Sequence, residues 1–257
     1  MSSIESKKMI LELESGEIVV GKLFGYKGTI SGELVFQTGI TGYNETLTDP
    51  SYANQIIVFT TPLINNYGIP PLNSYDEYNL LKYYESNKPS CSAIIVQEYT
   101  ENSSHYLDIN NNELGNNSNI ISLTDWLVDN KIIGLSGIDT RYLTKIIREQ
   151  GVCRARIYPS NLEDANLLPQ FLDINDENLV DKVSCDKLIS YETDLGEQVN
   201  NPKILFFDCG SKNNQLRSLI NNELIIDRVP YNFKISIEDL KLKYNGIFIS
   251  NGPGNPE

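Results

Sequence analysis

Two apolar segments joined by a long polar connection place the strongest constraint on how this chain folds. The segments are residues 34–38 and 56–60, and both are predicted as strands. The second is apolar enough to be buried on both faces of a sheet. The connection between them is longer than most loops of compact domains, and loops of that length usually carry a function.

One turn inside this connection can be explained residue by residue. Pro50 fixes the backbone angle φ at the second position of Asp49-Pro50-Ser51-Tyr52, and the Asp49 carboxylate can accept a hydrogen bond from the backbone two residues later. Together they place the Ser51 hydroxyl at the tip of a rigid turn. There the hydroxyl can contact a ligand, or it can bond only to its own turn.

The same stretch closely resembles the N-terminal domain of the small, glutamine-handling chain of carbamoyl-phosphate synthetase, in the motif GE-x-VFQTG-x-TGY-x-E-x-LTDPSY-x-x-Q. The resemblance continues in register over residues 9–257. The sequences FQTG and, at residues 66–71, NYGIPP are most similar to the form fused into the multifunctional eukaryotic pyrimidine protein. That form also contains aspartate carbamoyltransferase and dihydroorotase.

Composition narrows the possible partners and compartments. The net charge of −13 disfavours bulk attraction to nucleic acid or to an anionic membrane. The sequence has no apolar run of about eighteen residues and no apolar segment of a signal peptide, so we expect neither a membrane span nor secretion. Four cysteines form no C-x-x-C pair, and His105 is the one histidine, so no metal site is expected. These features predict a cytoplasmic protein.

Local patterns predict the elements of the N-terminal part. Residues 14–17 are expected to form the turn of a β-hairpin. The Asn- and Ser-rich residues 102–119 are expected to form a mobile loop. Ser122 and Asp139 should each cap a helix. The remaining predictions are hairpin strands at 9–13 and 18–24, helices at 75–85 and 162–172, and a strand at 92–96.

The helix after Asp139 should end at Gly151 and bears a cationic stripe of Arg141, Lys145 and Arg148. The stripe can be a solvated face, or it can dock an acidic partner. Its sequence, GIDTRYLTKIIREQG, also resembles a segment of the same family, which implies a role at the partner interface. The side chains expected to point inward are Tyr142, Leu143, Ile146 and Ile147.

After Pro202 the sequence alternates strand and helix patterns, at 203–208, 213–221, 223–229, 237–244 and 246–250. This alternation predicts a parallel sheet with helices on its faces, and therefore an α/β fold. No covering helix follows the last strand, so we expect this domain to be incomplete. The expected domains are residues 1–158, a connecting segment at 159–201, and the beginning of a second domain at 202–257.

Ligands of open parallel sheets bind beyond the carboxyl ends of the strands. The loop of Asn251 to Gly254 occupies such an end, and its glycines can present backbone N–H groups to a ligand. Two such donors could stabilise the oxyanion formed when a nucleophile attacks an amide. As a pattern alone, Gly-Pro-Gly is a weak signal that favours an ordinary turn over a binding site.

The sequence SNGPGNP resembles the SNGPGDP loop of class I glutamine amidotransferase domains, which have a flavodoxin-like sheet. The resemblance implies that Gly252 and Gly254 line a glutamine site, with the Gly252 amide as an oxyanion donor. Ser51 matches the serine that reaches the same substrate from the first domain. Asn255 stands where the family usually has Asp, and we expect the loss of a hydrogen bond rather than of function.

The catalytic thiol is a separate question. Cys209 lacks the G-x-C-x-G elbow of an activated nucleophile, and His105 is the one histidine that could serve as its base. A buried thiol at a strand end is therefore the favoured interpretation. In the family the nucleophilic Cys, with its His and Glu, follows the glycine loop, so all three are expected beyond Glu257. This chain should hold part of a glutamine pocket and no catalytic triad.

Three functions are compatible with these features. The resemblance implies that the complete protein hydrolyses L-glutamine and passes ammonia to a synthetase domain or chain. With bicarbonate, ATP and Mg, that synthetase makes carbamoyl phosphate in the first step of pyrimidine synthesis. Residues 1–158 could instead be a docking module without catalytic activity. A nucleotide site at residues 208–211 is the third possibility, although no Gly-x-Gly-x-x-Gly fingerprint is present.

Overall fold

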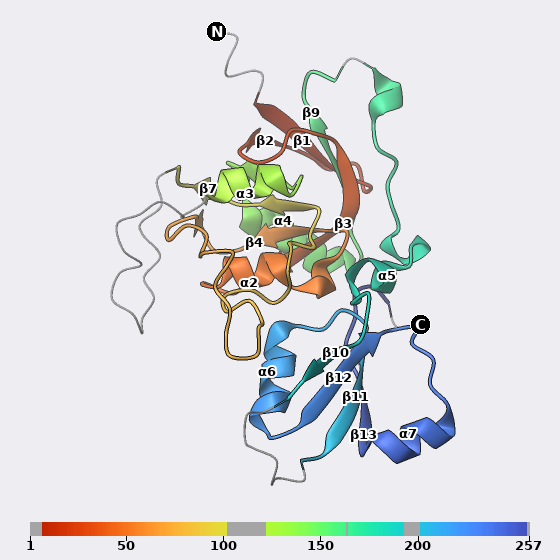
Figure 1. Ribbon diagram of the computed structural model, residues 1–257. Coiled ribbons are helices and arrows are strands. Elements are labelled where there is room, and N and C mark those ends of the chain that lie inside the picture. Colours follow the sequence, from red (N-terminus) through yellow and green to blue (C-terminus); the bar gives the residue numbers. More distant parts are fainter. Residues whose placement is uncertain (1–6, 102–121, 163, 193–200, 256–257) are drawn as a thin grey trace. The chain divides into compact units, whose positions relative to one another are not determined.

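The computed structural model describes residues 7–101, 122–162, 164–192 and 201–255. By internal contacts the chain divides into two compact units, and each is discontinuous in sequence (Figure 1). We call them the barrel unit and the sheet unit. The barrel unit comprises Met1–Leu47, Asn54–Leu72 and Cys91–Glu177, and the sheet unit comprises Thr48–Ala53, Asn73–Ser90 and Asn178–Glu257. The domains expected from the sequence are continuous segments, whereas two short insertions of the first half pack with the second half.

The barrel unit is built around a closed barrel in the strand order β1-β2-β8-β6-β4-β3-β9. The neighbours β3, β4, β6 and β8 run parallel, and the remaining pairs are antiparallel. The predicted hairpin is confirmed as β1 and β2. The strands are β1 (Lys8–Leu13), β2 (Ile18–Leu23), β3 (Ile30–Gln37), β4 (Gln55–Phe59), β6 (Ala93–Ile95), β8 (Ile133–Ser136) and β9 (Arg154–Pro159), and a short parallel pair is formed by β5 (Leu63–Ile64) and β7 (Glu98–Tyr99).

Alternating side chains of these strands form the core of the barrel. In β1, Met9, Leu11 and Leu13 point inward and are fully buried. The prediction that the second apolar segment is buried on both faces is confirmed. Ile56 and Val58 belong to the barrel core, while their neighbours Ile57 and Phe59 are also buried.

Both predicted helix caps of this unit are confirmed. Ser122 Oγ accepts a hydrogen bond from Asp125 N (3.0 Å) at the start of α3 (Leu123–Asp129). Asp139 Oδ1 likewise accepts from Tyr142 N (3.0 Å) at the start of α4 (Thr140–Gln150). The latter helix ends at Gly151, whose φ of 76° suits glycine.

Three predictions about burial and loops need correction or fall outside the described residues. Tyr142 does not point inward; it is 44% exposed, and its hydroxyl donates to Glu17 (2.8 Å). The polar connection contains a short helix, α2 (Tyr43–Thr48), where the sequence suggested only loop. The expected mobile loop at 102–119, with His105, lies outside the described residues.

Two predicted helices are wrong, for the same physical reason. In the segment 75–85 the Asp76 carboxylate accepts from the N–H groups of Tyr78 and Leu80, which ties the backbone into a turn instead of a helix. In 162–172 the structure has only a short 3₁₀ turn, η2 (Ala165–Leu167), preceded by Asp164, which accepts from Asn166 N (2.9 Å). Side-chain acceptors that bind nearby N–H groups compete with helix formation.

The sheet unit contains the predicted alternation. Its sheet has the order β10-β12-β11-β13, in which β12, β11 and β13 are parallel, as the sequence predicts. The antiparallel edge strand β10 and the helix α5 lie in the segment that the sequence assigned to a connection. The elements of the sheet unit in this part of the chain are α5 (Leu179–Val183), β10 (Ile189–Tyr191), β11 (Lys203–Asp208), α6 (Asn213–Asn221), β12 (Ile225–Pro230), α7 (Ile237–Lys243) and β13 (Gly246–Ile249). The 3₁₀ turn η3 (Ile174–Asp176), which precedes them, belongs to the barrel unit.

The core of the sheet unit is smaller than that of the barrel. Phe206 stacks on Phe248 with ring centroids 5.0 Å apart, and Leu216 and Ile220 of α6 cover the sheet. Tyr191 of β10 and Leu80 join the same cluster. None of the described helices of either unit is long and apolar enough to cross a membrane.

Candidate functional site

The residues singled out from the sequence lie together in the sheet unit. Ser51 is in the 3₁₀ turn η1 (Pro50–Tyr52), and Gly252 and Gly254 follow β13. A Cβ added to Gly210, in the loop after β11, would lie 3.3 Å from Pro50 Cβ and 3.2 Å from Pro253 Cδ. The serine turn, the loop after β11 and the glycine loop therefore meet at the carboxyl ends of the parallel strands.

Both carboxylate oxygens of Asp49 hold the turn that carries Ser51 in place. Asp49 Oδ1 accepts from Ser51 N (3.0 Å), as the sequence predicts, and Oδ2 pairs with Lys212 Nζ at 2.7 Å. Burial acts to lower the pKa of Lys212, but the hydrogen bond and charge of Asp49 outweigh it and raise that pKa. The pair fixes the turn to the beginning of α6.

A chain of side-chain hydrogen bonds connects the serine to the glycine loop. Gln215 Nε2 donates to Asn251 Oδ1 (2.7 Å), and Asn251 Nδ2 donates to Ser51 Oγ (3.1 Å). Gln215 is itself oriented by Lys212 N, which donates to its Oε1 (3.1 Å). Since Ser51 Oγ accepts from Asn251, its own hydrogen remains able to donate to a ligand.

Both glycines of the loop are required by the backbone. A Cβ on Gly252 would lie 2.6 Å from Cys209 O, and Gly254 has a φ of 78°. Among the described residues, neither glycine N–H has a hydrogen-bond partner. Ser250 Oγ holds the base of the loop by accepting from Cys209 N (2.9 Å) and donating to Asn251 O (2.8 Å). The loop thus presents backbone donors on a rigid support.

The loop after β11 is organised by one buried carboxylate. Asp208 is fully buried; its Oδ1 accepts from Gly210 N and Ser211 N, and its Oδ2 accepts from Cys185 N and the Arg228 guanidinium. Burial alone would raise the pKa of Asp208, but the Arg228 charge and the N–H donors outweigh it and lower the pKa. Because both loop N–H groups are taken by Asp208, they are not free for a phosphate, which counts against the nucleotide site.

None of the four cysteines is activated in this chain. Burial, and then the charge of Asp208, raises the pKa of Cys209, and the same two causes raise that of Cys185 to about 11. Burial raises the pKa of Cys91 to about 12, and burial with Glu33 and Glu14 raises that of Cys153. These thiols stay protonated at neutral pH, whereas a nucleophilic cysteine needs a lowered pKa.

Sequence reasoning missed part of this site. Lys212 and Gln215 were not singled out, and Asn251 was named only as the first residue of the glycine loop, without a contact of its own. Lys212 and Asp49 are far apart in sequence, so no local pattern could pair them. Within the residues that the structure describes, no group of three His, Cys, Asp or Glu side chains could hold a metal ion.

The fold and the glycine loop place the sheet unit among amidotransferase-like domains, and comparison with known proteins agrees. Residues 205–257 match the family model for class-I glutamine amidotransferase, and residues 11–157 match the model for the carbamoyl-phosphate synthase small chain, CPSase domain. The second match covers more than half of the chain. The chain therefore belongs to the carbamoyl-phosphate synthase small-chain family.

Similar proteins come in two kinds. The chain is 39% identical to multifunctional protein pyr1-3 of Dictyostelium discoideum, over 100% of this chain and 11% of that protein. It is 41% identical to multifunctional protein CAD of Squalus acanthias, over 96% and 10%. It is 38% identical to the arginine-specific carbamoyl phosphate synthase small chain of Yarrowia lipolytica, over 95% and 51%. The chain thus spans about half of the small chain and about a tenth of each multifunctional relative.

Proposed function

We propose that this chain is part of a glutamine-hydrolysing carbamoyl-phosphate synthase, in which ammonia from L-glutamine supplies the synthesis of carbamoyl phosphate. The observation that carries the proposal is the link from Ser51 through Asn251 to the glycine loop. It brings a hydroxyl donor to the loop of Gly252 and Gly254, whose N–H groups have no hydrogen-bond partner among the described residues, a combination suited to an amino-acid substrate. The FQTG and NYGIPP sequences and the multifunctional relatives support pyrimidine synthesis as the pathway.

The residues have separate roles in this proposal. Ser51 and Gly254 bind glutamine, and Asn251 positions Ser51 through its 3.1 Å hydrogen bond. Attack on the glutamine amide places negative charge on the amide oxygen, and the Gly252 N–H stabilises that oxyanion. Asp49 and Lys212 are positioning residues that hold the turn bearing Ser51.

The attacking thiolate comes from another part of the full protein, because all four thiols of this chain have raised pKa values. ATP and Mg act in the synthetase part, as a ligase of this kind requires, and we propose a cytoplasmic location. The 257-residue chain by itself should therefore not hydrolyse glutamine. Ammonia release by the chain alone, followed with glutamate dehydrogenase, would contradict this assignment of the nucleophile.

The glutamine site is tested by Ser51→Ala in the full-length protein. Loss of one neutral hydrogen bond of about 0.5–1.5 kcal/mol should lower glutamine-dependent kcat/KM by about two- to tenfold. Synthesis from added ammonium chloride bypasses glutamine and should be unchanged. Ser218→Ala is the matched control, since Ser218 is an exposed residue of α6 that lies outside the site.

The test compares the rates of each variant with glutamine and with ammonia as the nitrogen source. A loss that is confined to glutamine and absent from the Ser218 variant supports the site. Equal rates with glutamine in wild type and Ser51→Ala would show that the hydroxyl does not contact the substrate. An equal loss with ammonia would show a general structural role instead.

A further inference from the structure

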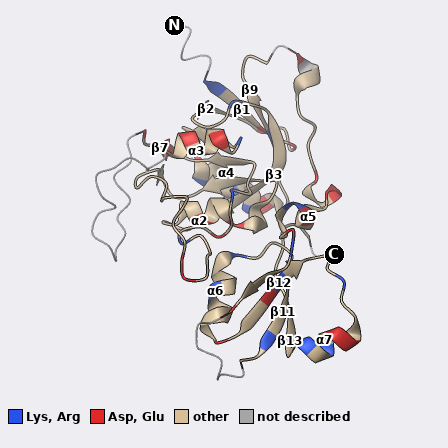
Figure 2. Cartoon of the chain, in the orientation of Figure 1, with Lys and Arg blue, Asp and Glu red and all other residues tan. Residues whose placement is uncertain are grey.

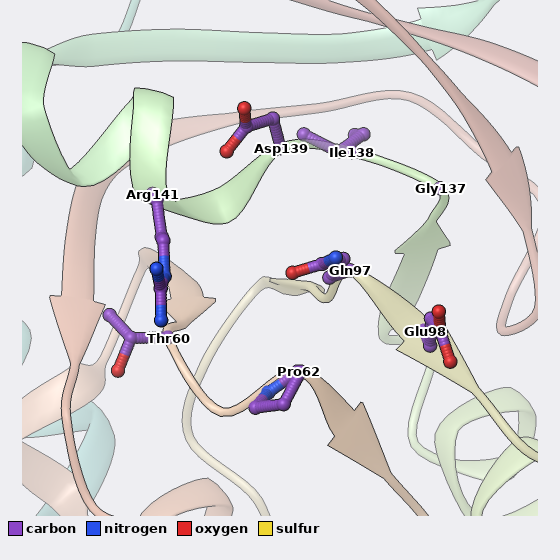
Figure 3. Close-up of a pocket in the computed structure, with 8 residues that line it drawn as sticks. All are labelled: Thr60, Pro62, Gln97, Glu98, Gly137, Ile138, Asp139 and Arg141. Carbon is purple, nitrogen blue, oxygen red and sulfur yellow. The ribbon is translucent and has the colours of Figure 1, made fainter.

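The side chains of the candidate glutamine site are joined by hydrogen bonds, unlike those of a hollow at strand ends of the barrel unit. That hollow, of about 720 Å³, opens where β4, β6 and β8 end (Figure 3). Its polar lining includes Gln97, Glu98, Asp139 and Arg141. In the part of the chain that the structure describes, no side-chain hydrogen bond joins any two of these. In the sheet unit, by contrast, Gln215, Asn251 and Ser51 form one series, which we call the hydrogen-bond series.

The hydrogen-bond series begins at a group that can only donate. A backbone N–H is always a donor, and Lys212 N donates to Gln215 Oε1 (3.1 Å). Gln215 is the third residue of α6, from which a glutamine side chain can reach back to the N–H before the helix, as in a capping box. Because the oxygen of Gln215 is used in this contact, its NH₂ group faces away from Lys212. The helix cap therefore fixes the orientation of the Gln215 amide.

The orientation of Gln215 in turn fixes that of Asn251. Gln215 Nε2 is a donor, so the Asn251 atom that it contacts at 2.7 Å is the acceptor Oδ1. The NH₂ group of Asn251 then faces Ser51 and donates to its Oγ (3.1 Å). The backbone of Asn251 is held as well, since Ser250 Oγ donates to its carbonyl oxygen (2.8 Å). The Asn251 amide is thus held in the orientation that donates to Ser51.

The direction of the series decides what the Ser51 hydroxyl can bind. Because Ser51 Oγ accepts from Asn251, its hydrogen is not used within the series and can be donated to a ligand. L-Glutamine offers carboxylate and amide oxygens to such a donor. In a reversed series Ser51 would donate to Asn251 and would present only lone pairs, which suit the ammonium group of an amino acid. The direction therefore selects an oxygen of the substrate.

No charge sets this direction, because the three side chains of the series are neutral. Charged side chains occur elsewhere in the sheet unit, for example on β12 and α7 (Figure 2). The direction depends instead on which group donates and which accepts at each contact. A carboxylate in place of the Gln215 amide would still accept from Lys212 N but could not donate to Asn251. That one change would reverse the series without removing a side chain.

We propose that Gln215 is a positioning residue for glutamine hydrolysis, an inference that rests on the proposed function. Gln215 acts through Asn251 and not on the substrate itself. By donating to Asn251 Oδ1 it keeps the Asn251 NH₂ group on Ser51. The Ser51 hydroxyl consequently donates its hydrogen to an oxygen of bound glutamine.

The test is Gln215→Glu in the full-length protein, assayed with glutamine and with ammonium chloride. The new side chain has nearly the same shape, and Glu is as suitable as Gln at this position of a capping box, so α6 should remain intact. Asn251 should turn its NH₂ group toward the carboxylate and its oxygen toward Ser51. Glutamine-dependent kcat/KM should fall by about two- to tenfold, as for Ser51→Ala, and the rate with ammonia should be unchanged.

Further variants separate positioning from a charge effect or a structural role. Asn214→Asp is the matched control, because it adds the same charge at an exposed, neighbouring residue of α6. Asn251→Asp keeps the acceptor for Gln215 but removes the donor to Ser51, so its loss should equal that of Gln215→Glu. The double variant Ser51→Ala/Gln215→Glu should be no slower than Ser51→Ala, because without the hydroxyl the direction of the series has no effect.

The proposal is supported if the loss is confined to glutamine, is absent from Asn214→Asp and disappears in the Ser51→Ala background. Unchanged glutamine use by Gln215→Glu, an equal loss in Asn214→Asp, or additive losses in the double variant would overturn it. A matching loss with ammonia would do the same, since it indicates a structural role. In all of these cases a loss in Ser51→Ala would leave the proposed function standing, whereas no loss in Ser51→Ala would overturn both.

Discussion

The two units differ in whether the edges of their sheets are paired. In the barrel unit each strand of the barrel is paired on both sides, and the inward side chains are completely buried. In the sheet unit β13 pairs only with β11 among the described strands, and its Ile247 and Ile249 are 51% and 70% exposed. The helix α7 before it has no buried residue, and its Leu242 is 82% exposed.

The two units also differ in role: the barrel unit has the larger apolar core, and the sheet unit carries the candidate glutamine site. The barrel unit packs its apolar side chains into one large core, whereas the sheet unit combines a smaller apolar core with a polar network at its strand ends. Asp208, Arg228 and the Asp49–Lys212 pair hold the loops that form the candidate glutamine site. The candidate site lies at the carboxyl ends of the strands, where loops rather than strand side chains line the binding position.

The largest expected effect is that of Asp208→Asn. Removing the charge leaves Arg228 buried without its partner, and we expect a loss of about 3–5 kcal/mol in the free energy of unfolding. In the barrel pair the Arg156 guanidinium is about as buried as that of Arg228, but the Glu12 carboxylate is 18% exposed and Asp208 is 0% exposed, so Glu12→Gln should cost less, about 1–2 kcal/mol. Urea unfolding of both variants measures the difference. Equal losses would erase the contrast between the units.

The same pair predicts a pH dependence. The pKa of Asp208 is lowered in the folded protein, so its contribution is fully present above the unfolded pKa of about 3.9 and is lost as pH falls through the folded value. Wild-type stability should therefore decline below about pH 4, and Asp208→Asn should flatten part of that decline. Urea midpoints between pH 3 and 6 test this, and parallel curves for the two proteins would contradict it.

The next effect compares the two cores directly. Leu34→Ala in the barrel and Leu216→Ala in the sheet unit each remove a buried side chain, and each should cost about 2–5 kcal/mol. Trp126, the one tryptophan, belongs to the barrel unit, so its fluorescence reports unfolding of that unit. We expect Leu34→Ala to move the fluorescence transition and Leu216→Ala to move mainly the far-ultraviolet signal. Equal shifts of both signals would show that the units unfold together.

Sequence patterns predicted those elements whose signals are local. The alternation from 203 to 250 and the caps Ser122 and Asp139 each depend on neighbouring residues, and the structure has them in place. The strand β10 is only three residues long and has no such signal, since it exists through its pairing with β12. Closure of the barrel by β1 and β9 is likewise a long-range event that periodicity cannot show.

The candidate site also has one part that local sequence predicts and one part that depends on long-range contacts. The turn at Asp49 follows from local chemistry, whereas the meeting of Ser51 with the glycine loop was expected only from family resemblance. Asn251 makes that contact across 200 positions of sequence, and nothing local marks it as the linking residue. The helix predicted at 75–85 failed because the Asp76 carboxylate binds the N–H groups that a helix would use.

Helix caps give a smaller and sharper comparison. Asp139→Ala removes the cap of α4, whose Leu143 and Ile147 are buried in the barrel core, and should cost about 1 kcal/mol. Ser236→Ala removes the cap of α7, which buries no side chain, so only that helix should fray. Urea unfolding should show the first loss, and amide exchange confined to α7 should show the second. A global loss from Ser236→Ala as large as that from Asp139→Ala would mean that α7 contributes to the core.

The smallest expected effect on stability is that of Ile249→Lys at the open edge. Since Ile249 is 70% exposed, the substitution should change the free energy of unfolding by no more than about 0.5 kcal/mol. A lysine on an edge strand also opposes pairing with another chain, so self-association in sedimentation velocity should decrease. A loss above about 1 kcal/mol would show that this edge is packed in solution, and the contrast between a closed barrel and an open sheet would then not hold.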